Sequence, residues 1–237
     1  MRRPDDWLTH PSVARIESVA KILGDLNARI VYIGGAIAPI LQTEPPFPSA
    51  RITKDVDALA ATVDYKEHAR VQQQLRKLGF REASAEPHAH RWVAPSGIIF
   101  DLVPAGDHLG ASGQRWDRLT LKTAVTLQLR RKVTVRHASA AAFLALKFAA
   151  FHDRGAADPA ASHDLEDIVC LIASRSTIVE DVASTRAEIA QYVGAECRAL
   201  VAHAYYDDLL AGNLNHAFNP RSTIALVQDR LAKLSAV

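Results

Sequence analysis

The feature that most constrains this chain is a short apolar segment with an acidic residue at two alternating positions. In a β-strand, residues two apart point to the same face of the sheet. The segment Asp55-Val56-Asp57-Ala58-Leu59 therefore presents two carboxylates on one face and apolar side chains on the other. Neighbouring anions in an apolar strand repel each other and lose hydration. A fold that contains this strand has to provide the two carboxylates with a partner.

A third aspartate raises the same question farther along the chain. Asp101 is the only charged residue between Ile98 and Val103, in a run that predicts a buried strand. Mg²⁺ or Mn²⁺ would be a suitable partner, because such a hard cation takes carboxylate oxygens and shares its remaining sites with substrate phosphates. Three aspartates could hold two ions about 3.5–4 Å apart, the geometry of in-line nucleotidyl displacement. The alternative is that Asp55 and Asp57 cap a turn and Asp101 pairs with an arginine.

A pair of glycines precedes the acidic segment by about twenty residues. Residues 29–33 predict a short apolar strand, Gly34-Gly35 ends it, and residues 36–41 predict the start of a helix. Glycines at such a turn let the backbone approach a ligand, and the N–H groups of a helix start can bind phosphate oxygens. The position of the pair favours a phosphate site over a plain turn.

The order of these motifs resembles the polymerase-beta-like nucleotidyltransferase superfamily: a strand, Gly-Gly, a helix, Arg-x-Thr-Lys-Asp-x-Asp over residues 51–57, and a later strand with an aspartate. The match is closest to the AbiEii-like nucleotidyltransferases, the toxin halves of some bacterial toxin–antitoxin pairs, MenT-type toxins included. The resemblance spans about residues 29–175. It implies an α/β fold with a mixed sheet flanked by helices, followed by a C-terminal helical domain.

The resemblance also implies roles for individual residues. The aspartates would hold Mg²⁺ and the glycine turn would hold a nucleoside triphosphate such as ATP. The residues that match position by position are Gly34, Gly35, Asp55, Asp57 and Asp101. The family usually has a serine or threonine after the glycines, but residues 36–38 carry no hydroxyl. Phosphate contact would then fall to backbone N–H groups and to basic residues such as Arg51 and Lys54, and reduced activity or an altered substrate stays an open alternative.

A second, helical part of the chain begins near residue 138. Residues 140–151 predict an apolar helix in which Lys147 is the only charge, and a buried ammonium needs a partner unless it reaches solvent. Ser162 is expected to cap the next helix, where acidic residues favour the helix dipole. The resemblance implies that Lys147 contacts phosphates and that Asp164, or else Asp167, faces the site. Without the resemblance, Lys147 would lie on the wet side of its helix.

These patterns divide the chain of 237 residues into a nucleotidyltransferase catalytic domain over residues 1–137 and a helical domain over residues 138–237 that completes the site. The hydrophobic content of 49% is enough for a substantial core. A net charge of +2 is too small to argue for nucleic-acid binding from charge alone. Contact with RNA would need a local basic patch.

The remaining composition favours a cytoplasmic protein. Two cysteines, Cys170 and Cys197, are too few for a disulfide framework or a zinc cluster, which suits a reducing compartment. The N-terminal residues have no apolar core of a secretion signal, and no stretch of 18 apolar residues predicts a membrane span.

The sequence therefore predicts a Mg²⁺-dependent nucleotidyltransferase that moves a nucleotide from a nucleoside triphosphate to an acceptor hydroxyl. The resemblance implies the 3′ end of a tRNA or a protein side chain as acceptor, and an antitoxin protein as a possible partner. Two alternatives stay open. One is a small-molecule nucleotidyltransferase of the aminoglycoside-modifying kind, and the other is a non-catalytic nucleotide-binding module, which the missing hydroxyl after Gly35 suggests.

Overall fold

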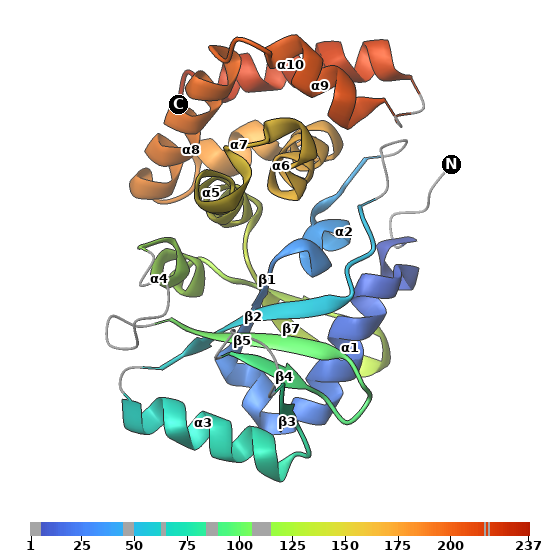
Figure 1. Cartoon of the computed structure of the whole chain (residues 1–237), viewed down its shortest axis with the longest axis vertical. Coiled ribbons are helices and arrows are strands. Elements are labelled where there is room, and N and C mark those ends of the chain that lie inside the picture. The colour runs from blue at the N-terminus through green and yellow to red at the C-terminus, as the bar shows by residue number, and fades with distance from the viewer. Residues whose placement is uncertain are drawn as a thin grey trace. The chain divides into compact units, whose positions relative to one another are not determined.

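The computed structural model describes residues 6–44, 50–62, 65–83, 90–105, 115–215, 217 and 219–237. The chain folds into two compact units. The sheet unit contains Asp5–Pro39 and Arg51–Ser139, and the helical unit contains Ile40–Ala50 and Ala140–Val237. The chain therefore leaves the sheet unit after Pro39 and returns to it at Arg51 before it enters the helical unit again (Figure 1).

The sheet unit is built on a mixed sheet that has seven strands within the described residues. Their bounds are β1 Ile30–Ile33, β2 Asp55–Ala61, β3 Arg81–Glu82, β4 Arg91–Val93, β5 Ile99–Ala105, β6 Val125–Gln128 and β7 Thr134–His137. The strand order is β3-β4-β5-β2-β1-β7-β6. β2 lies at the centre, where it pairs antiparallel with β1 and parallel with β5. The α/β class and the mixed sheet with flanking helices are confirmed (Figure 1).

Helices and short turns of helix surround this sheet. They are η1 Asp6–Thr9, α1 Pro11–Leu23, η2 Gly24–Arg29, η3 Gly35–Ile37, α2 Ala38–Leu41, α3 Tyr65–Lys77, α4 Arg115–Lys122 and η4 Arg130–Lys132. α1 ends at Gly24, whose φ of 53° is a conformation that favours glycine. Residues 11–24 carry apolar side chains at helical spacing and end in glycine, which predicts a helix, and α1 confirms it. α1 packs against β2 and against η3, the turn that follows β1.

Cross-strand register gives the sheet two different faces. Tyr32, Ala58 and Leu102 lie opposite one another on the face that also carries the buried Phe100. The other face carries an apolar cluster around Val31 and Leu59, against which Leu121 of α4 packs. The three aspartates of interest lie on this second face, beyond the end of that cluster.

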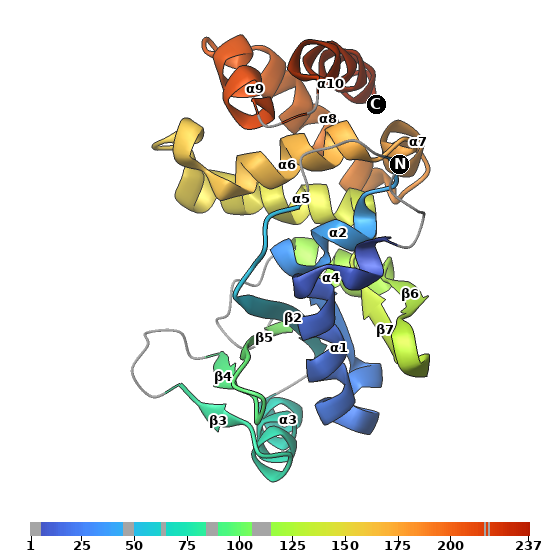
Figure 2. The ribbon, with the colours of Figure 1, turned by 90° about the vertical axis from the view of Figure 1, so that its right-hand side faces the viewer.

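The helical unit is all helix in its described residues after 140 (Figure 2). Its elements are α5 Ala140–Ala150, the π-helical turn η5 Phe151–Gly155, η6 Pro159–Ala161, α6 His163–Ser174, α7 Ile178–Ala183, α8 Ala187–Val201, α9 Tyr206–Leu214 and α10 Pro220–Leu234. Ser162 caps α6, as predicted, because its hydroxyl accepts a hydrogen bond from the N–H of Leu165 at 3.3 Å.

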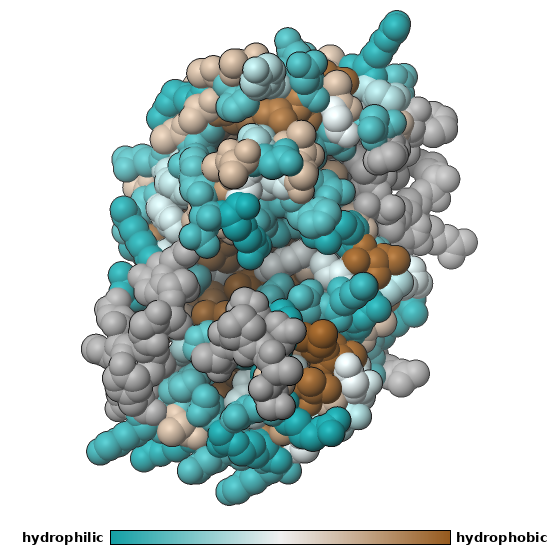
Figure 3. All heavy atoms as spheres, viewed as in Figure 1, coloured by the Kyte–Doolittle hydropathy of each residue, from teal (hydrophilic) through white to brown (hydrophobic). Residues whose placement is uncertain are grey.

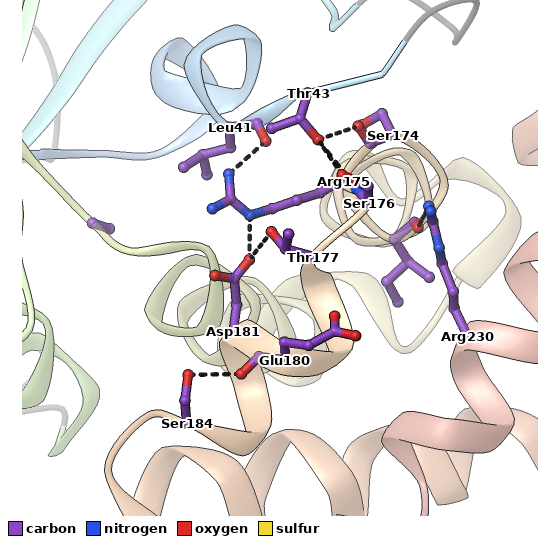
Figure 4. A network of polar contacts seen from close by, with 12 residues as sticks. Leu41, Thr43, Ser174, Arg175, Ser176, Thr177, Glu180, Asp181, Ser184 and Arg230 are labelled. Carbon is purple, nitrogen blue, oxygen red and sulfur yellow. Dashed lines mark hydrogen bonds and ion pairs between the residues drawn. The ribbon is translucent and has the colours of Figure 1, made fainter.

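A polar network ties the segment after α2 to the end of α6 (Figure 4). The backbone N–H of Thr43 donates to the carbonyl of Ser174 at 2.9 Å. Arg175 donates to the carbonyl of Leu41 at 3.0 Å and also pairs with Asp181 of α7. These contacts explain why Ile40–Ala50 belongs to the helical unit, although Gly35 and the strand β2 on either side of it belong to the sheet unit. Residues 45–49 of the predicted proline-rich loop lie outside the described residues.

Two expectations from the sequence differ from the structure. In the sequence, Gly194 is a possible break in the helical stretch 183–210, but it lies inside α8, where its missing side chain makes room for the C-terminal residues. A Cβ there would lie 3.2 Å from the carbonyl oxygen of Leu234. Residues 119–135 alternate apolar and polar side chains in part, which predicts one or two strands, and β6 and the first part of β7 lie there. The residues up to Lys122 belong to helix α4 instead.

No helix in the described part of the chain is both long and apolar enough to cross a membrane. On the face shown in Figure 3, the described residues are mostly hydrophilic. Among the described residues, the large hydrophobic side chains that are exposed come from separate parts of the chain: Ile52, Val125, Val201, Tyr205 and Val237. Isolated residues of this kind are normal on protein surfaces.

Candidate active site

Three carboxylates meet on one face of the central strands, as the alternation in the sequence predicted. Asp57 of β2 lies directly opposite Asp101 of β5 in the parallel register, and Asp55 precedes Asp57 by two residues on the same face. One carboxylate oxygen from each residue can be chosen so that all three lie within 4.8 Å of one another. All three residues are half-buried. We call Asp55, Asp57 and Asp101 the acidic triad.

The surroundings of the triad are polar on one side and apolar on the other. Ile33 lies opposite Asp57 on β1, and Val103 follows Asp101 on the same face of β5, so the apolar cluster begins directly beside the carboxylates. On the other side, Arg91 of β4 forms a two-pronged pair with Asp101, with N–O distances of 2.9 and 2.8 Å. Such a pair fixes the plane of the carboxylate as well as its charge.

The alternative that Asp101 pairs with an arginine is therefore correct as a statement about contacts. It does not displace the prediction of a shared acidic face, because Asp101 lies beside Asp55 and Asp57 as well. Within the described residues the triad is the one group of carboxylates, histidines and cysteines whose ligand atoms come this close together.

Gly34 is packed against the triad. It ends β1 with φ 70° and ψ −171°, a backbone conformation that is essentially restricted to glycine. A Cβ on this residue would lie 2.1 Å from an Oδ2 atom of Asp57, closer than any real contact. Glycine is thus required here both by the backbone angle and by the space that the Asp57 carboxylate occupies. Gly35 follows as the first residue of η3 and is buried.

The basic residues that the sequence placed near the phosphates lie just before β2. Arg51 is half-buried and Lys54 is exposed, one residue before Asp55. Thr53 between them is anchored, because its backbone N–H donates to the hydroxyl of Ser12 at the start of α1 over 3.2 Å. The segment that leads into β2 is therefore anchored to α1.

Lys147 and Asp164 meet within the helical unit. Lys147 of α5 is buried, and its ammonium lies 3.0 Å from a carboxylate oxygen of Asp164 and also contacts Asp167. The guanidinium of Arg154 donates to the same Asp164 at 2.8 and 3.0 Å. The alternative that Lys147 lies on the wet side of its helix is wrong. Asp164 and Asp167, one turn apart on α6, both contact it.

Charge pairing decides the ionisation of this buried network. Burial alone would lower the pKa of Lys147, but the carboxylates of Asp167 and Asp164 outweigh it and raise the pKa above the usual 10.5. Burial alone would raise the pKa of Asp164, but Arg154 and Lys147 hold it below the usual 3.8. Both groups are therefore charged at neutral pH, and the network is an ion-pair cluster rather than a proton-sharing one.

The cysteines take no part in either group. Neither is in a disulfide, and burial raises the pKa of the Cys170 and Cys197 thiols to about 12. A thiol with so high a pKa is neutral at physiological pH and is a poor nucleophile or metal ligand.

The triad has the chemistry that a hard divalent cation needs. Its donors are all carboxylate oxygens, and they lie close enough together to share one ion or a pair of ions. Because Gly34 has no side chain, only backbone atoms of that residue lie beside the Asp57 carboxylate. The residues present therefore fit Mg²⁺ or Mn²⁺.

Sequence reasoning missed Arg91, although one signal could have identified it. Pro95-Ser96-Gly97 is a turn signal in the sequence, and the observed β4–β5 register is symmetric about Ser96. Counting outward from that residue places Arg91 opposite Asp101. Arg154 and its pairing with Asp164 had no such signal, because a π-helical turn carries the arginine and no periodic pattern describes its position.

No protein-family model matches the sequence, and no curated protein sequence is similar to it. Solved structures of similar fold include an antigenic nucleotidyltransferase-like protein from Paracoccidioides brasiliensis, which is 19% identical. The match covers 85% of this chain and 91% of that one, with a TM-score of 0.48. The antibiotic-resistance factor ANT(2'')-Ia is 15% identical over 81% of this chain and 100% of that one, also with a TM-score of 0.48.

A third similar structure is JHP933 from Helicobacter pylori, which is 13% identical. It matches over 98% of this chain and 93% of that one, with a TM-score of 0.47. All three matches extend over most of both chains at identities below 20%.

Proposed function

We propose that the protein is a Mg²⁺-dependent nucleotidyltransferase that moves a nucleotide from a nucleoside triphosphate to an acceptor hydroxyl. The observation that carries the proposal is the acidic triad: three carboxylates from two parallel strands, with their oxygens within 4.8 Å of one another. A bound divalent cation would neutralise the triphosphate and polarise its phosphorus–oxygen bonds. The glycine requirement at Gly34 supports the proposal, because it keeps the Asp57 carboxylate and the neighbouring backbone in contact.

In the reaction proposed, the acceptor oxygen forms a bond to the α-phosphorus and the bond to the β-phosphate bridging oxygen breaks, which releases pyrophosphate. Asp55 and Asp57 would hold the cation that accompanies the triphosphate. Asp101 would hold a second cation and help to draw the proton from the attacking hydroxyl. Gly34 and Gly35 would offer backbone to the phosphates, and Arg51 and Lys54 would add positive charge.

We propose that Lys147 and Asp164 act in phosphate binding as well. Support comes from the way the lysine is held: its ammonium is buried between two carboxylates, and Arg154 fixes one of them. Lys147 stays protonated at neutral pH, so it carries the positive charge that a phosphate oxygen would need as a partner. The acceptor is proposed to be the 3′ end of a tRNA or a protein side chain, and the biological role that of a toxin with an antitoxin partner.

Label transfer tests the proposal. Wild-type protein is incubated with each α-³²P-labelled nucleoside triphosphate, Mg²⁺ and, in separate arms, total tRNA, cell lysate and an aminoglycoside. We expect label on RNA or protein, with Asp57→Ala reducing transfer on the order of 10²–10³-fold. Asp208→Ala is the matched control, because this aspartate is exposed on α9, and it should retain full transfer.

The outcomes separate the alternatives. Transfer to the aminoglycoside alone would identify a small-molecule nucleotidyltransferase. Calorimetry that detects Mg²⁺·nucleotide binding without turnover on any acceptor would identify a non-catalytic module. Equal transfer by wild type and Asp57→Ala would contradict the role of the acidic triad altogether.

A further inference from the structure

One positive charge already bridges two members of the acidic triad. Arg91 lies directly opposite Asp101 in the antiparallel pairing of β4 and β5, so both side chains rise from the same face. Its guanidinium donates to both oxygens of Asp101, at 2.9 and 2.8 Å. The same guanidinium lies 3.9 Å from Asp55. Arg91 thus brings positive charge to the two carboxylates that flank Asp57.

This contact is built into the sheet and is not a loose surface pair. The Arg91 side chain is 22% exposed and that of Asp101 is 17% exposed, so the two groups interact with little screening by solvent. Arginine stays protonated at any physiological pH, and its planar fork matches a carboxylate. The positive charge beside Asp101 is therefore permanent for as long as the side chain keeps this orientation.

A divalent cation at Asp101 would face that permanent charge. Two like charges a few ångströms apart in a half-buried site repel strongly, and both oxygens of Asp101 are already engaged by Arg91. The Asp57 carboxylate lies next to Gly34. A cation at Asp101 therefore has to compete with Arg91 for both oxygens of that carboxylate.

We propose that Arg91 is the resident counter-ion of the second cation position. It holds Asp101 while that position lacks a divalent cation, and it has to release Asp101 before a second cation can bind there. The released guanidinium keeps its five N–H donors, and the triphosphate that arrives with the cation offers it new acceptors. Nucleotide would thus favour loading of the second cation. This inference rests on the proposed function.

Binding of Mn²⁺, followed by electron paramagnetic resonance of the free ion, tests this inference without any turnover. Wild type is titrated with and without a non-hydrolysable nucleoside triphosphate analogue, beside Arg91→Gln and Arg91→Lys. We expect wild type to bind a second Mn²⁺ weakly until the analogue is added. Arg91→Gln should tighten second-site binding by about tenfold without the analogue. Arg91→Lys keeps the positive charge and loses the planar guanidinium, so its second-site Mn²⁺ affinity should lie between those of wild type and Arg91→Gln.

Arg81→Gln is the matched control. Arg81 is an exposed arginine on the neighbouring strand β3, so its loss changes the net charge equally and leaves the triad contacts intact. Its Mn²⁺ titration should stay within twofold of wild type. The double variant Arg91→Gln, Asp101→Asn should lose the tighter second-site Mn²⁺ binding seen in Arg91→Gln, because the carboxylate that pairs with Arg91 is then absent.

Two results would overturn the inference alone while the proposed function stands. Arg91→Gln and Arg81→Gln could titrate alike, or Arg91→Gln could bind Mn²⁺ more weakly than wild type, which would make Arg91 a support for the site and not a competitor. Absence of Mn²⁺ binding in wild type and in all variants, with and without the analogue, would overturn the metal site and the inference together. Circular-dichroism melting of each variant shows whether its fold is kept, and Arg91→Lys gives a second reading of the same contact.

Discussion

At the scale of single residues, the candidate site depends on the absence of a side chain at Gly34. The Asp57 carboxylate occupies the space into which a side chain at Gly34 would point. The glycine therefore shapes the carboxylate's position, in addition to any contact that its backbone makes with a ligand. This explains why the turn after β1 and the acidic strand belong together in one motif.

Gly34→Ala should consequently damage the triad and not only the turn. A Cβ 2.1 Å from Oδ2 has to push the Asp57 carboxylate away, so we expect the Mn²⁺ affinity to fall by at least about tenfold. Backbone strain at this φ and ψ should separately lower the free energy of unfolding by about 1–3 kcal/mol. Mn²⁺ titration and urea unfolding measure the two effects separately.

Gly97→Ala is the control for that experiment. Gly97 also has a positive φ, 80°, but no atom lies within 4 Å of its added Cβ. It should lose about 1–2 kcal/mol of stability and bind Mn²⁺ as wild type does. If both alanine variants bound Mn²⁺ equally well, Gly34 would have no role in placing Asp57.

The sequence allowed the triad to be predicted residue by residue, because the period of two in a strand places Asp55 and Asp57 on one face and the resemblance adds Asp101. The surroundings of the triad were harder to predict from the sequence. Arg91 could have been placed only by counting register from a turn, and the burial of Lys147 could not be derived from its own helix. A lone lysine in an apolar helix fits a buried ion pair as well as a solvated stripe until the partner helix is known.

At the scale of elements, α5 and α6 are joined by charges in their common interior. Lys147 of α5 contacts Asp164 and Asp167 of α6, and all three residues are buried. Removing one partner from such a group leaves the other charges without compensation, which costs more than the group contributes as a whole. Lys147→Ala should therefore lower the free energy of unfolding by about 3–5 kcal/mol, as measured by urea denaturation.

A variant that removes the whole charge group is the informative control. Lys147→Met combined with Asp164→Asn and Asp167→Asn leaves no buried charge unpaired among these three residues. It should recover part of the stability lost in Lys147→Ala. A triple variant less stable than Lys147→Ala would show that the ion pairs themselves, and not the avoidance of lone charges, stabilise the helix pair.

The same network predicts how stability depends on pH. The pKa of Asp164 is lowered in the folded protein, so its contribution is complete above its unfolded value of 3.8 and is lost as the pH falls through the lower folded value. The pKa of Lys147 is raised, so its contribution is complete below 10.5 and is lost as the pH rises through the higher folded value. The gap in unfolding free energy between wild type and Asp164→Asn should be constant between pH 5 and 8 and shrink below pH 3.8. A gap that persists unchanged at pH 2 would contradict the assignment.

Two helical glycines offer a prediction about packing. In α9, an added Cβ at Gly212 meets no atom within 4 Å, so Gly212→Ala should stabilise the protein by about 0.5–1 kcal/mol through helix propensity. In α8, the same change at Gly194 brings a Cβ to 3.2 Å from the backbone of Leu234. The crowding there should cancel the gain, so that Gly194→Ala is neutral or destabilising. Thermal melting of the two variants compares them directly.

Most elements could be predicted from the sequence because they carry local signals. The helix that ends at Gly24 and the cap at Ser162 are examples, and the antiparallel return after residues 95–97 is another. Gly194 misled the prediction, because a glycine can mark close approach of two backbones as well as the end of a helix. Only the C-terminal residues that pack against α8 distinguish the two cases.

At the scale of the whole molecule, one buried arginine joins parts of the helical unit that are distant in the chain. Arg230 of α10 donates to the carbonyls of Ile172 and Ala173 at 2.8 Å each, and pairs with Glu44 at 3.0 Å. It thereby satisfies backbone groups near the end of α6 and helps to hold the segment after α2. No local pattern in the sequence predicts contacts between residues so far apart in the chain.

Arg230→Ala should weaken the helical unit without touching the triad. The loss of a buried donor leaves two carbonyls short of a partner, so we expect a cost of about 2–3 kcal/mol in urea unfolding. Mn²⁺ binding at 20 °C should be unchanged, because all three carboxylates belong to the sheet unit. Arg221→Ala, an exposed change on the same helix, should alter neither quantity. A fall in Mn²⁺ affinity in Arg230→Ala alone would show that the triad depends on the helical unit.

The side-by-side course of β2 and β5 in the same direction has a consequence for how the protein assembles. Parallel neighbours cannot be joined by a tight turn, and here α3 and the β3–β4 hairpin come between them in the chain. The acidic triad is therefore not assembled until that long intervening segment has folded back. Any ion that binds there binds the native chain alone and draws the population toward it by mass action. The divalent cation proposed to act in catalysis would therefore also stabilise the folded protein.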